Sequence, residues 1–287
     1  MKNRDFIITS LQPWDIEIGS TIKNTALEIS KNNRVLYINT PMDYSTRLRG
    51  NKNKAWTRRM DVIKKQASPI RQINEHMWIA DCPFCVLPVG GLPTTCLFDW
   101  INRINNRKIA DYIHQITAQL NFNNYIHLID TDIYRSQYLK EYLTPSLSIY
   151  YCRDFVIGES YWKKNGVRLE PLLAAKSDIV LANSTHFSER FRQYNRHTFS
   201  IETGVNLALY DGRKKWLIPE DIKPIPHPII GYVGTVNSTR LDSDLLLQIA
   251  EERPVYSFVF TGPEDEVFSQ HPIHRLPNIS VSYTHLT

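Results

Sequence analysis

The chain has 287 residues, of which 42% are hydrophobic and 22% charged. This composition is ordinary for a soluble globular protein with a buried core, and it excludes disordered and fibrous classes. The mean hydropathy is -0.34, and no apolar run reaches the ~18 residues that a membrane-spanning helix needs. The apolar stretch at residues 6–8 is too short for a secretory signal, so we expect a cytoplasmic protein. The net charge of +5 modestly favours anionic partners.

Short runs of β-branched and aromatic residues alternate with helical patterns along most of the chain. In residues 98–120, for example, isoleucines recur near the period of about 3.6 residues that is typical of an amphipathic helix. Such alternation predicts βαβ units, and therefore an α/β fold with a doubly wound parallel sheet. The expected strands are residues 6–9, 34–39, 77–80, 125–130, 147–151, 178–182 and 199–202.

A proline-rich segment predicts a boundary between two domains. Residues 216–228 contain four prolines, which remove backbone donors and disfavour a helix, so we interpret this segment as a linker. The predicted domains are residues 1–225 and residues 226–287.

The second domain is predicted to open with one βαβ unit. Its expected elements are a strand at 229–233, a helix at 242–251 with Leu241, Leu245 and Ile249 on one face, and a strand at 256–261, with a third strand beginning at 279–281. A nucleotide-binding half of this kind needs several such units. We therefore expect the second domain to be incomplete, which makes it a truncated Rossmann-like domain.

Four segments together resemble GT-B glycosyltransferases, in particular the family-4-like cytoplasmic enzymes that build cell-envelope polysaccharides and exopolysaccharides. Residues 148–155, SIYYCRDF, are similar to the family's Y-x-C-x-D strand and loop, and residues 175–190 resemble its A-D-x-V-x-x-x-S strand and helix. Residues 201–206, IETGVN, stand where the family has P-N-G-V-D, with departures at Glu202, Thr203 and Asn206. Residues 228–234, PIIGYVG, resemble the strand that opens the family's second domain.

The resemblance implies two Rossmann-like domains that face each other across a cleft. The first would bind a glycan or lipid-linked acceptor and the second a nucleotide sugar, which is a substrate rather than a cofactor. No metal is implied, and analogy gives a hexosyltransferase that retains the anomeric configuration. The family's Arg-Lys pair and ribose-binding glutamate would lie after Thr287, so we expect no transfer activity from the 287-residue chain alone. The competing hypothesis is a non-catalytic protein of the same fold that binds a sugar nucleotide or a partner.

Glycines and a cation near predicted helix starts are candidates for contact with the donor phosphates. Ligands of open α/β sheets lie beyond the carboxyl ends of the strands, where helix N-termini favour anions. Gly234 would let the backbone approach a diphosphate, Arg240 would add charge, and Gly262 follows the next strand. In the first domain the resemblance places Gly19 and Ser20 near the sugar phosphates. The alternatives are a simple turn at Gly234 and a plain helix cap at Gly19 and Ser20.

Carboxylates at predicted strand ends are the candidates for catalysis. Glycosyl transfer needs an acceptor hydroxyl that is deprotonated or hydrogen-bonded as it attacks. Asp154, beside Arg153, is our first choice for acceptor contact or general base, and Asp130 is our second. Many family members have a His-Asp pair at the latter position, but Ile129 replaces the histidine here. The alternative is that each carboxylate caps a neighbouring helix.

Residues 47–65 form a basic stretch with eight Lys or Arg residues and one acid, Asp61. Its apolar residues, Trp56, Met60 and Ile63 among them, fall at helical spacing. One hypothesis is peripheral contact with an anionic membrane at its inner face, and the other is a solvated helix whose apolar side packs on its own domain. We expect no nucleic-acid partner, because the chain has no motif that recognises bases.

The Cys82-Pro-Phe-Cys85 motif is the remaining candidate for metal or redox chemistry. No second C-x-x-C or His-x-x-x-His completes a zinc site, and proline-rich sequence follows where a redox motif would open a helix. We therefore expect no metal site and reduced thiols.

Overall fold

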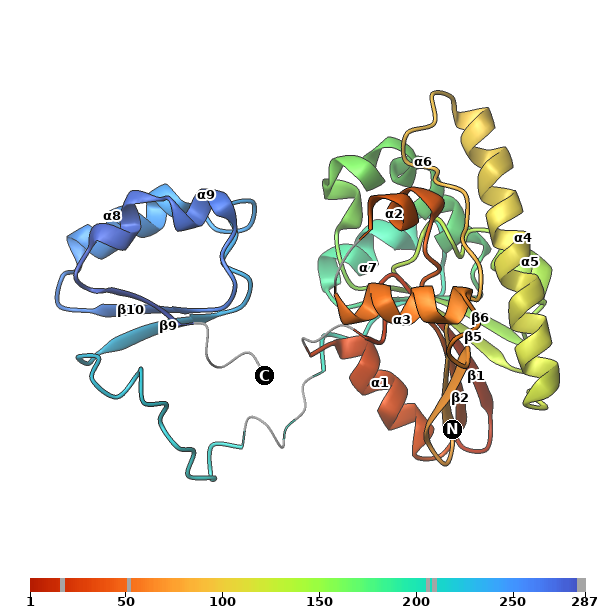
Figure 1. Ribbon diagram of the computed structural model, residues 1–287, viewed down its shortest axis with the longest axis horizontal. Helices are drawn as coiled ribbons and strands as arrows, with labels where there is room; N and C mark the ends of the chain where they lie inside the picture. The colour runs from red at the N-terminus through yellow and green to blue at the C-terminus, as the bar shows by residue number, and fades with distance from the viewer. Residues whose placement is uncertain (16–18, 51–52, 205–206, 208–210, 283–287) are drawn as a thin grey trace. The chain divides into compact units, whose positions relative to one another are not determined.

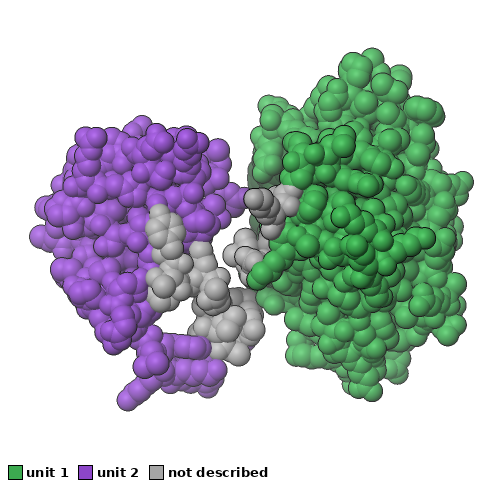
Figure 2. Space-filling view, viewed as in Figure 1, with its two compact units in different colours: residues 1–206 green, residues 207–287 purple. Residues whose placement is uncertain are grey.

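The computed structural model describes residues 1–15, 19–50, 53–204, 207 and 211–282. The chain forms two compact units, Met1–Asn206 and Leu207–Thr287, coloured separately in Figure 2. Each unit has its own sheet, one of eight strands and one of three. The boundary lies earlier than the predicted one at residue 226. Part of the expected linker is tied to the second unit, because the Ser282 hydroxyl donates to the Asp221 carboxylate at 2.6 Å.

The first unit is built on a sheet with the order β3-β4-β2-β1-β5-β6-β7-β8. All neighbouring strands are parallel except β3 and β4. The seven predicted strands of this unit are confirmed, with ends that differ by at most two residues. The strands are β1 (Asp5–Ser10), β2 (Arg34–Ile38), β3 (Ile70–Asn74), β4 (Met77–Ala80), β5 (Ile126–Asp130), β6 (Leu147–Cys152), β7 (Ile179–Ala182) and β8 (Thr198–Ser200).

The strand order creates a switch point between β1 and β5. From β1 the chain proceeds to β2 on one side of the sheet, and it later returns to β5 on the other side of β1. Ligands of open α/β sheets bind outside the carboxyl ends of the strands at such a point. All residues of β1 and β5 are buried, so the switch point lies above a rigid core.

Helices cover the sheet of the first unit, as Figure 1 shows. The long α4, predicted at residues 98–120, packs through an apolar face that includes Phe98, Ile109 and Ile113. The helices are α1 (Thr21–Ser30), α2 (Tyr44–Arg49), α3 (Lys54–Ile63), α4 (Thr95–Gln119), α5 (Leu139–Leu143), α6 (Ser160–Lys176) and α7 (Thr185–Arg192), with a 3-10 turn at Val156–Gly158.

The second unit has a parallel sheet with the order β11-β10-β9. Helices α8 and α9 lie over one face of it (Figure 1). Helix α8 packs through Leu246, Leu247 and Ala250, whereas Leu245 and Ile249, which we expected to share its apolar face, are 51% and 37% exposed. The elements are β9 (Ile229–Val233), α8 (Ser243–Glu252), β10 (Ser257–Thr261), α9 (Glu266–Ser269), a 3-10 turn (Pro272–Arg275) and β11 (Ile279–Ser282).

Candidate functional site

A hydrogen-bonded polar network lies at the switch point of the first unit. Ser10 ends β1, Asp130 ends β5, and Arg153 follows β6. The Arg153 guanidinium donates through Nε and Nη2 to the two oxygens of Asp130, the latter at 3.0 Å, and the Ser10 hydroxyl donates to Asp130 Oδ2 at 2.6 Å. The structure thus brings together residues that are more than a hundred positions apart in the sequence.

The network extends to the start of α1 through Gln12. Arg153 Nη2 donates to Gln12 Oε1 at 3.3 Å, and the Ser20 hydroxyl donates to the same oxygen. Ser20 occupies the N-cap position of α1, but its side chain makes no capping hydrogen bond. The Ser20 hydroxyl therefore does not cap α1, as the alternative interpretation expects, but hydrogen-bonds within the network. Neighbouring Gly19 is exposed and its Cα faces open space.

Thr131 ties the ends of β5 and β6 together beneath the network. Its backbone N–H donates to the Tyr151 carbonyl at 2.9 Å, and its hydroxyl accepts from the Arg153 backbone N–H at 3.2 Å. It has a φ of 57°, which is a costly conformation for a β-branched residue. Thr131 thus carries backbone strain and also fixes the positions of Asp130 and Arg153.

The Asp130–Arg153 pair is buried, and its charges are mutually compensated. Burial raises the pKa of Asp130, while the hydrogen bonds and charge of Arg153 oppose that rise. Burial also disfavours the charge of Arg153, but Asp130 outweighs this effect and raises the pKa of Arg153. Because both Asp130 oxygens are engaged, this carboxylate is placed to position Arg153. Asp132, two residues further on, is also buried, and burial raises its pKa.

Asp154 differs from Asp130 in being open to solvent. Its side chain is 63% exposed, and one of its oxygens lies 3.9 Å from Arg153 Nη1. No described residue donates a hydrogen bond to the Asp154 carboxylate. The carboxylate is consequently available to a ligand.

A second polar cluster lies at the carboxyl ends of β2 and β4, and sequence reasoning missed it. Asn39 Nδ2 donates to Asp81 at 2.7 Å and to Asp15 at 3.0 Å, and Arg58 and Arg71 pair with these two carboxylates at 3.1 and 2.8 Å. Asn39 is the last residue of one predicted strand and Asp81 directly follows another, so their positions at strand ends could have indicated this cluster.

The glycines predicted for the second unit lie at adjacent strand ends. Gly234 has a φ of 156° and Gly262 a φ of 150°, and a Cβ at Gly262 would meet the Gly234 carbonyl oxygen. The close contact between the backbones of Gly234 and Gly262 therefore requires a glycine at position 262, whether or not a ligand binds there. Arg240 is exposed and makes no side-chain hydrogen bond or ion pair among the described residues. Its position, shortly before α8, leaves it available to an anion.

The basic stretch 47–65 includes the end of α2 and the whole of α3. The apolar side of α3 packs on its own unit, since Met60 joins a small core with Trp56 and Ile63 against it. This packing supports the second of the two hypotheses for α3. On α2, by contrast, Leu48 is 86% exposed. No described helix is long and apolar enough to cross a membrane.

The two cysteines of the C-x-x-C motif are part of the hydrophobic core. Cys82 and Cys85 are both buried, and burial raises the pKa of Cys82 to about 12. Such a thiol is inert at neutral pH. The residues that the structure describes contain no cluster of three or more potential metal ligands. In the 201–206 segment, Glu202 has a φ of 55°, whereas Val205 and Asn206 lie outside the described residues.

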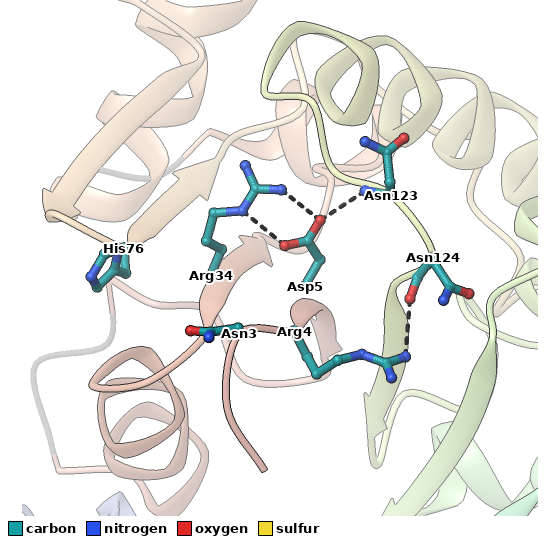
Figure 3. Close-up of a pocket in the computed structure, with 7 residues that line it drawn as sticks. All are labelled: Asn3, Arg4, Asp5, Arg34, His76, Asn123 and Asn124. Carbon is teal, nitrogen blue, oxygen red and sulfur yellow. Dashed lines mark hydrogen bonds and ion pairs between the residues drawn. The ribbon is translucent and has the colours of Figure 1, made fainter.

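A cavity of about 570 Å³ lies at the opposite, amino edge of the sheet (Figure 3). Arg34 and Asp5 form a bidentate pair there, and the Asn123 backbone N–H donates to Asp5 at 2.7 Å. Arg4 donates to the Asn124 carbonyl oxygen and to Ser146. Because these charged groups satisfy one another or the backbone, we assign them a structural role.

Comparison with solved structures identifies the fold. No protein-family model matches the sequence, and neither does any curated protein sequence. The chain is similar in structure to HepE from Anabaena, solved with UDP and glucose (TM-score 0.57, 13% identity, 97% of this chain and 69% of that one). It is also similar to sucrose-phosphate synthase from Thermosynechococcus elongatus (TM-score 0.61, 11% identity, 99% of this chain and 71% of that one). A third similar structure is that of a putative UDP-N-acetylglucosamine 2-epimerase from Listeria monocytogenes (TM-score 0.54, 10% identity, 98% of this chain and 68% of that one).

These similarities confirm the predicted fold. The chain has an α/β fold of the GT-B type, in which the first unit is a doubly wound, mainly parallel sheet and the second is Rossmann-like.

Proposed function

We propose that the protein is a glycosyltransferase that moves a sugar from a nucleotide-sugar donor to a glycan or lipid-linked acceptor. The observation that carries the proposal is the Ser10–Asp130–Arg153 network at the switch point, which leaves Asp154 exposed beside a fixed guanidinium. The GT-B fold supports it, since HepE and sucrose-phosphate synthase share that fold.

Each part of the network has a role in this proposal. Asp154 accepts a hydrogen bond from the attacking acceptor hydroxyl and takes up its proton. Arg153 supplies a positive charge that Asp130 and Ser10 hold in place, so little reorganisation is needed when charge develops during the reaction. Ser20 and Gly19 are proposed to lie close to the donor phosphates, at the start of α1.

The second unit is proposed to bind the donor. Gly234 and Gly262 form a turn region at the carboxyl ends of β9 and β10, with Arg240 exposed nearby. Backbone N–H groups and a cation at such a position suit a diphosphate. The nucleotide sugar is the substrate, and we propose no metal or other cofactor.

Finer parts of the proposal rest on the sequence resemblance. These are a family-4-like enzyme of envelope or exopolysaccharide synthesis, retention of the anomeric configuration, and action in the cytoplasm. Peripheral contact with an anionic membrane is proposed for the exposed surface of α2 around Leu48 rather than for α3.

The test is an assay with product analysis on the protein as expressed from its own gene. A panel of nucleotide sugars is incubated with candidate glycan acceptors, and NMR identifies the products. A new glycosidic bond supports the proposal. Inversion at the sugar C2 would instead indicate an epimerase, the activity named for the Listeria protein of the same fold. Binding of nucleotide sugars without any product would indicate the non-catalytic alternative.

A further inference from the structure

An exposed aromatic side chain directly follows Asp154 in the chain. Phe155 lies in the loop between β6 and the 3-10 turn at Val156–Gly158, and 54% of it is exposed. Single exposed apolar residues are common on protein surfaces, so exposure by itself assigns Phe155 no role. Phe155 is distinguished instead by how firmly its ring is held and by the carboxylate that lies next to it.

Three residues hold the Phe155 ring. Phe187, in the first turn of α7, stacks on it with ring centroids 6.2 Å apart and ring planes 12° apart. The Arg190 guanidinium carbon lies 5.5 Å from the centroid of the Phe155 ring. A Cβ at Gly158 would lie 3.0 Å from Phe155 Cδ1, so this glycine also packs closely against the ring. The ring is therefore fixed in place although more than half of the residue is exposed.

A buried carboxylate anchors Arg190 in turn. Glu170, on α6, has a side chain that is 1% exposed, and it accepts a hydrogen bond from Arg190 Nη2 at 2.7 Å. Its other oxygen accepts from the Tyr150 hydroxyl at 2.8 Å. A charge-assisted hydrogen bond of this kind keeps the guanidinium in its place over Phe155. The exposed ring is thus supported by the core of the first unit, so little side-chain entropy is lost when a ligand rests on it.

Phe155 and Asp154 together offer an apolar surface and a hydrogen-bond acceptor side by side. Consecutive Cα atoms are about 3.8 Å apart, and the Asp154 side chain, at 63% exposure, starts from the same loop. A sugar ring combines the two matching chemistries. Its axial C–H groups form an apolar face that packs on the electron-rich face of an aromatic ring, and its hydroxyls donate to a carboxylate. An alkyl chain matches Phe155 alone, and a phosphate matches neither side chain.

We propose that Phe155 is a specificity-determining residue, which selects acceptors whose attacking hydroxyl belongs to a sugar ring by stacking against the apolar face of that ring. The inference rests on the proposed function and deepens it, because it names the chemical class of the attacking group. Asp154 receives a hydroxyl of the same ring that rests on Phe155.

Saturation-transfer NMR on the whole chain, without a donor, tests the stacking directly. The probes are the methyl β-glycosides of glucose, galactose and N-acetylglucosamine, and glucitol, which has hydroxyls but no ring, is the control ligand. We expect saturation of the ring C–H protons of at least one glycoside, with affinity about fivefold lower in Phe155→Ala and retained in Phe155→Tyr. Phe199→Ala, at a similarly exposed phenylalanine on β8 (52%), is the matched control and should bind normally.

Three outcomes of this experiment would overturn the proposal. They are binding of none of the glycosides, unchanged binding in Phe155→Ala, and equal binding of glucitol and the glycosides.

Phe155→Leu separates ring stacking from a general apolar contact. Leucine keeps much of the apolar volume but has no π-system, so it should lose as much glycoside affinity as alanine does. Full affinity in Phe155→Leu would indicate a surface for any apolar group, such as a lipid chain, and would contradict the proposal. The Tm of each variant shows whether the fold is kept. If Phe155→Ala unfolds, the comparison of Phe155→Leu with Phe155→Tyr decides the question in the same way.

The transfer assay distinguishes failure of this inference from failure of the proposed function. With the donor and acceptor that the panel identifies, Phe155→Ala should raise the acceptor KM about fivefold and leave the donor KM unchanged. Transfer with an unchanged acceptor KM would remove this inference alone. Glycoside binding that depends on Phe155, without a new glycosidic bond from any donor, would remove the proposed function alone.

Discussion

Arg153 and Asp130 form a two-point ion pair at the switch point of the sheet, with Nη2 and Oδ2 3.0 Å apart and the Asp130 side chain fully excluded from solvent. Asp130 ends β5, Arg153 directly follows the neighbouring strand β6, and each residue constrains the other. Asp130 fixes the plane of the guanidinium, and Arg153 compensates a carboxylate that burial alone would make unfavourable.

Replacing Asp130 is therefore expected to cost stability as well as activity. Asp130→Asn keeps the shape but leaves Arg153 without its counter-charge, so we predict a loss of about 3 kcal/mol in the free energy of unfolding. Urea denaturation measures this loss. In the double variant Asp130→Asn with Arg153→Met, the two effects should be clearly smaller than additive. Additive effects would show that the pair is energetically independent.

His127 is predicted to make the first unit sensitive to acid. It is fully buried on β5, its Nε2 lies 2.9 Å from the Thr9 hydroxyl, and burial lowers its pKa to about 3. Between pH 6.5 and 3 the unfolded chain binds a proton at this residue and the folded chain does not. Stability is consequently complete above pH 6.5 and falls as the pH decreases, by up to about 1.4 kcal/mol per pH unit.

The variant His127→Gln removes this titration and keeps a group that can hydrogen-bond to Thr9. Denaturation curves at several pH values should show a shallower acid dependence for it than for the unchanged protein. His76→Gln, at an exposed position, serves as the control. An identical pH dependence in His127→Gln and the unchanged protein would refute the prediction.

Gly262 is predicted to be essential to the second unit for reasons of packing. A Cβ there would lie 1.7 Å from the Gly234 carbonyl oxygen, so the backbone must move in Gly262→Ala. We expect a loss of at least about 2 kcal/mol, visible as faster hydrogen exchange in β10. Gly231→Ala is the matched control, because its Cβ meets nothing within 4 Å. Equal exchange in both variants would contradict this account.

The parallel strands could be predicted from the sequence because both faces of this sheet are covered, which makes each strand a continuous apolar run. β3 was missed since its residues Ile70–Asn74 are largely polar and half-exposed, so only the pairing with β4 makes it a strand. Helix α8 was predicted to within one residue at each end, but Leu245 and Ile249 of its expected apolar face are exposed. Three consecutive leucines, at 245–247, do not indicate which side of the helix is buried.

The candidate site was predictable only in part. Positions after strand ends pointed to Asp130, Asp154 and Arg153, because parallel strands present their carboxyl ends at one edge. Which carboxylate is buried depends on contacts with Ser10 and Gln12, far away in the sequence.

Asp154 is the residue on which the account depends most. We predict that the exposed carboxylate of Asp154, beside Arg153, accepts the proton of the attacking hydroxyl. Asp154→Asn should then lower kcat by about 100-fold or more while donor binding is retained. Asp111→Asn, an exposed aspartate on α4, is the matched control and should be fully active.

The most direct test is the kcat of sugar transfer in Asp154→Asn and Asp111→Asn, measured side by side in the protein expressed from its own gene, with the nucleotide sugar that the panel identifies. The account predicts a large loss in the first variant, unchanged Tm in both, and normal turnover in the second. Equal turnover in the two variants would contradict it.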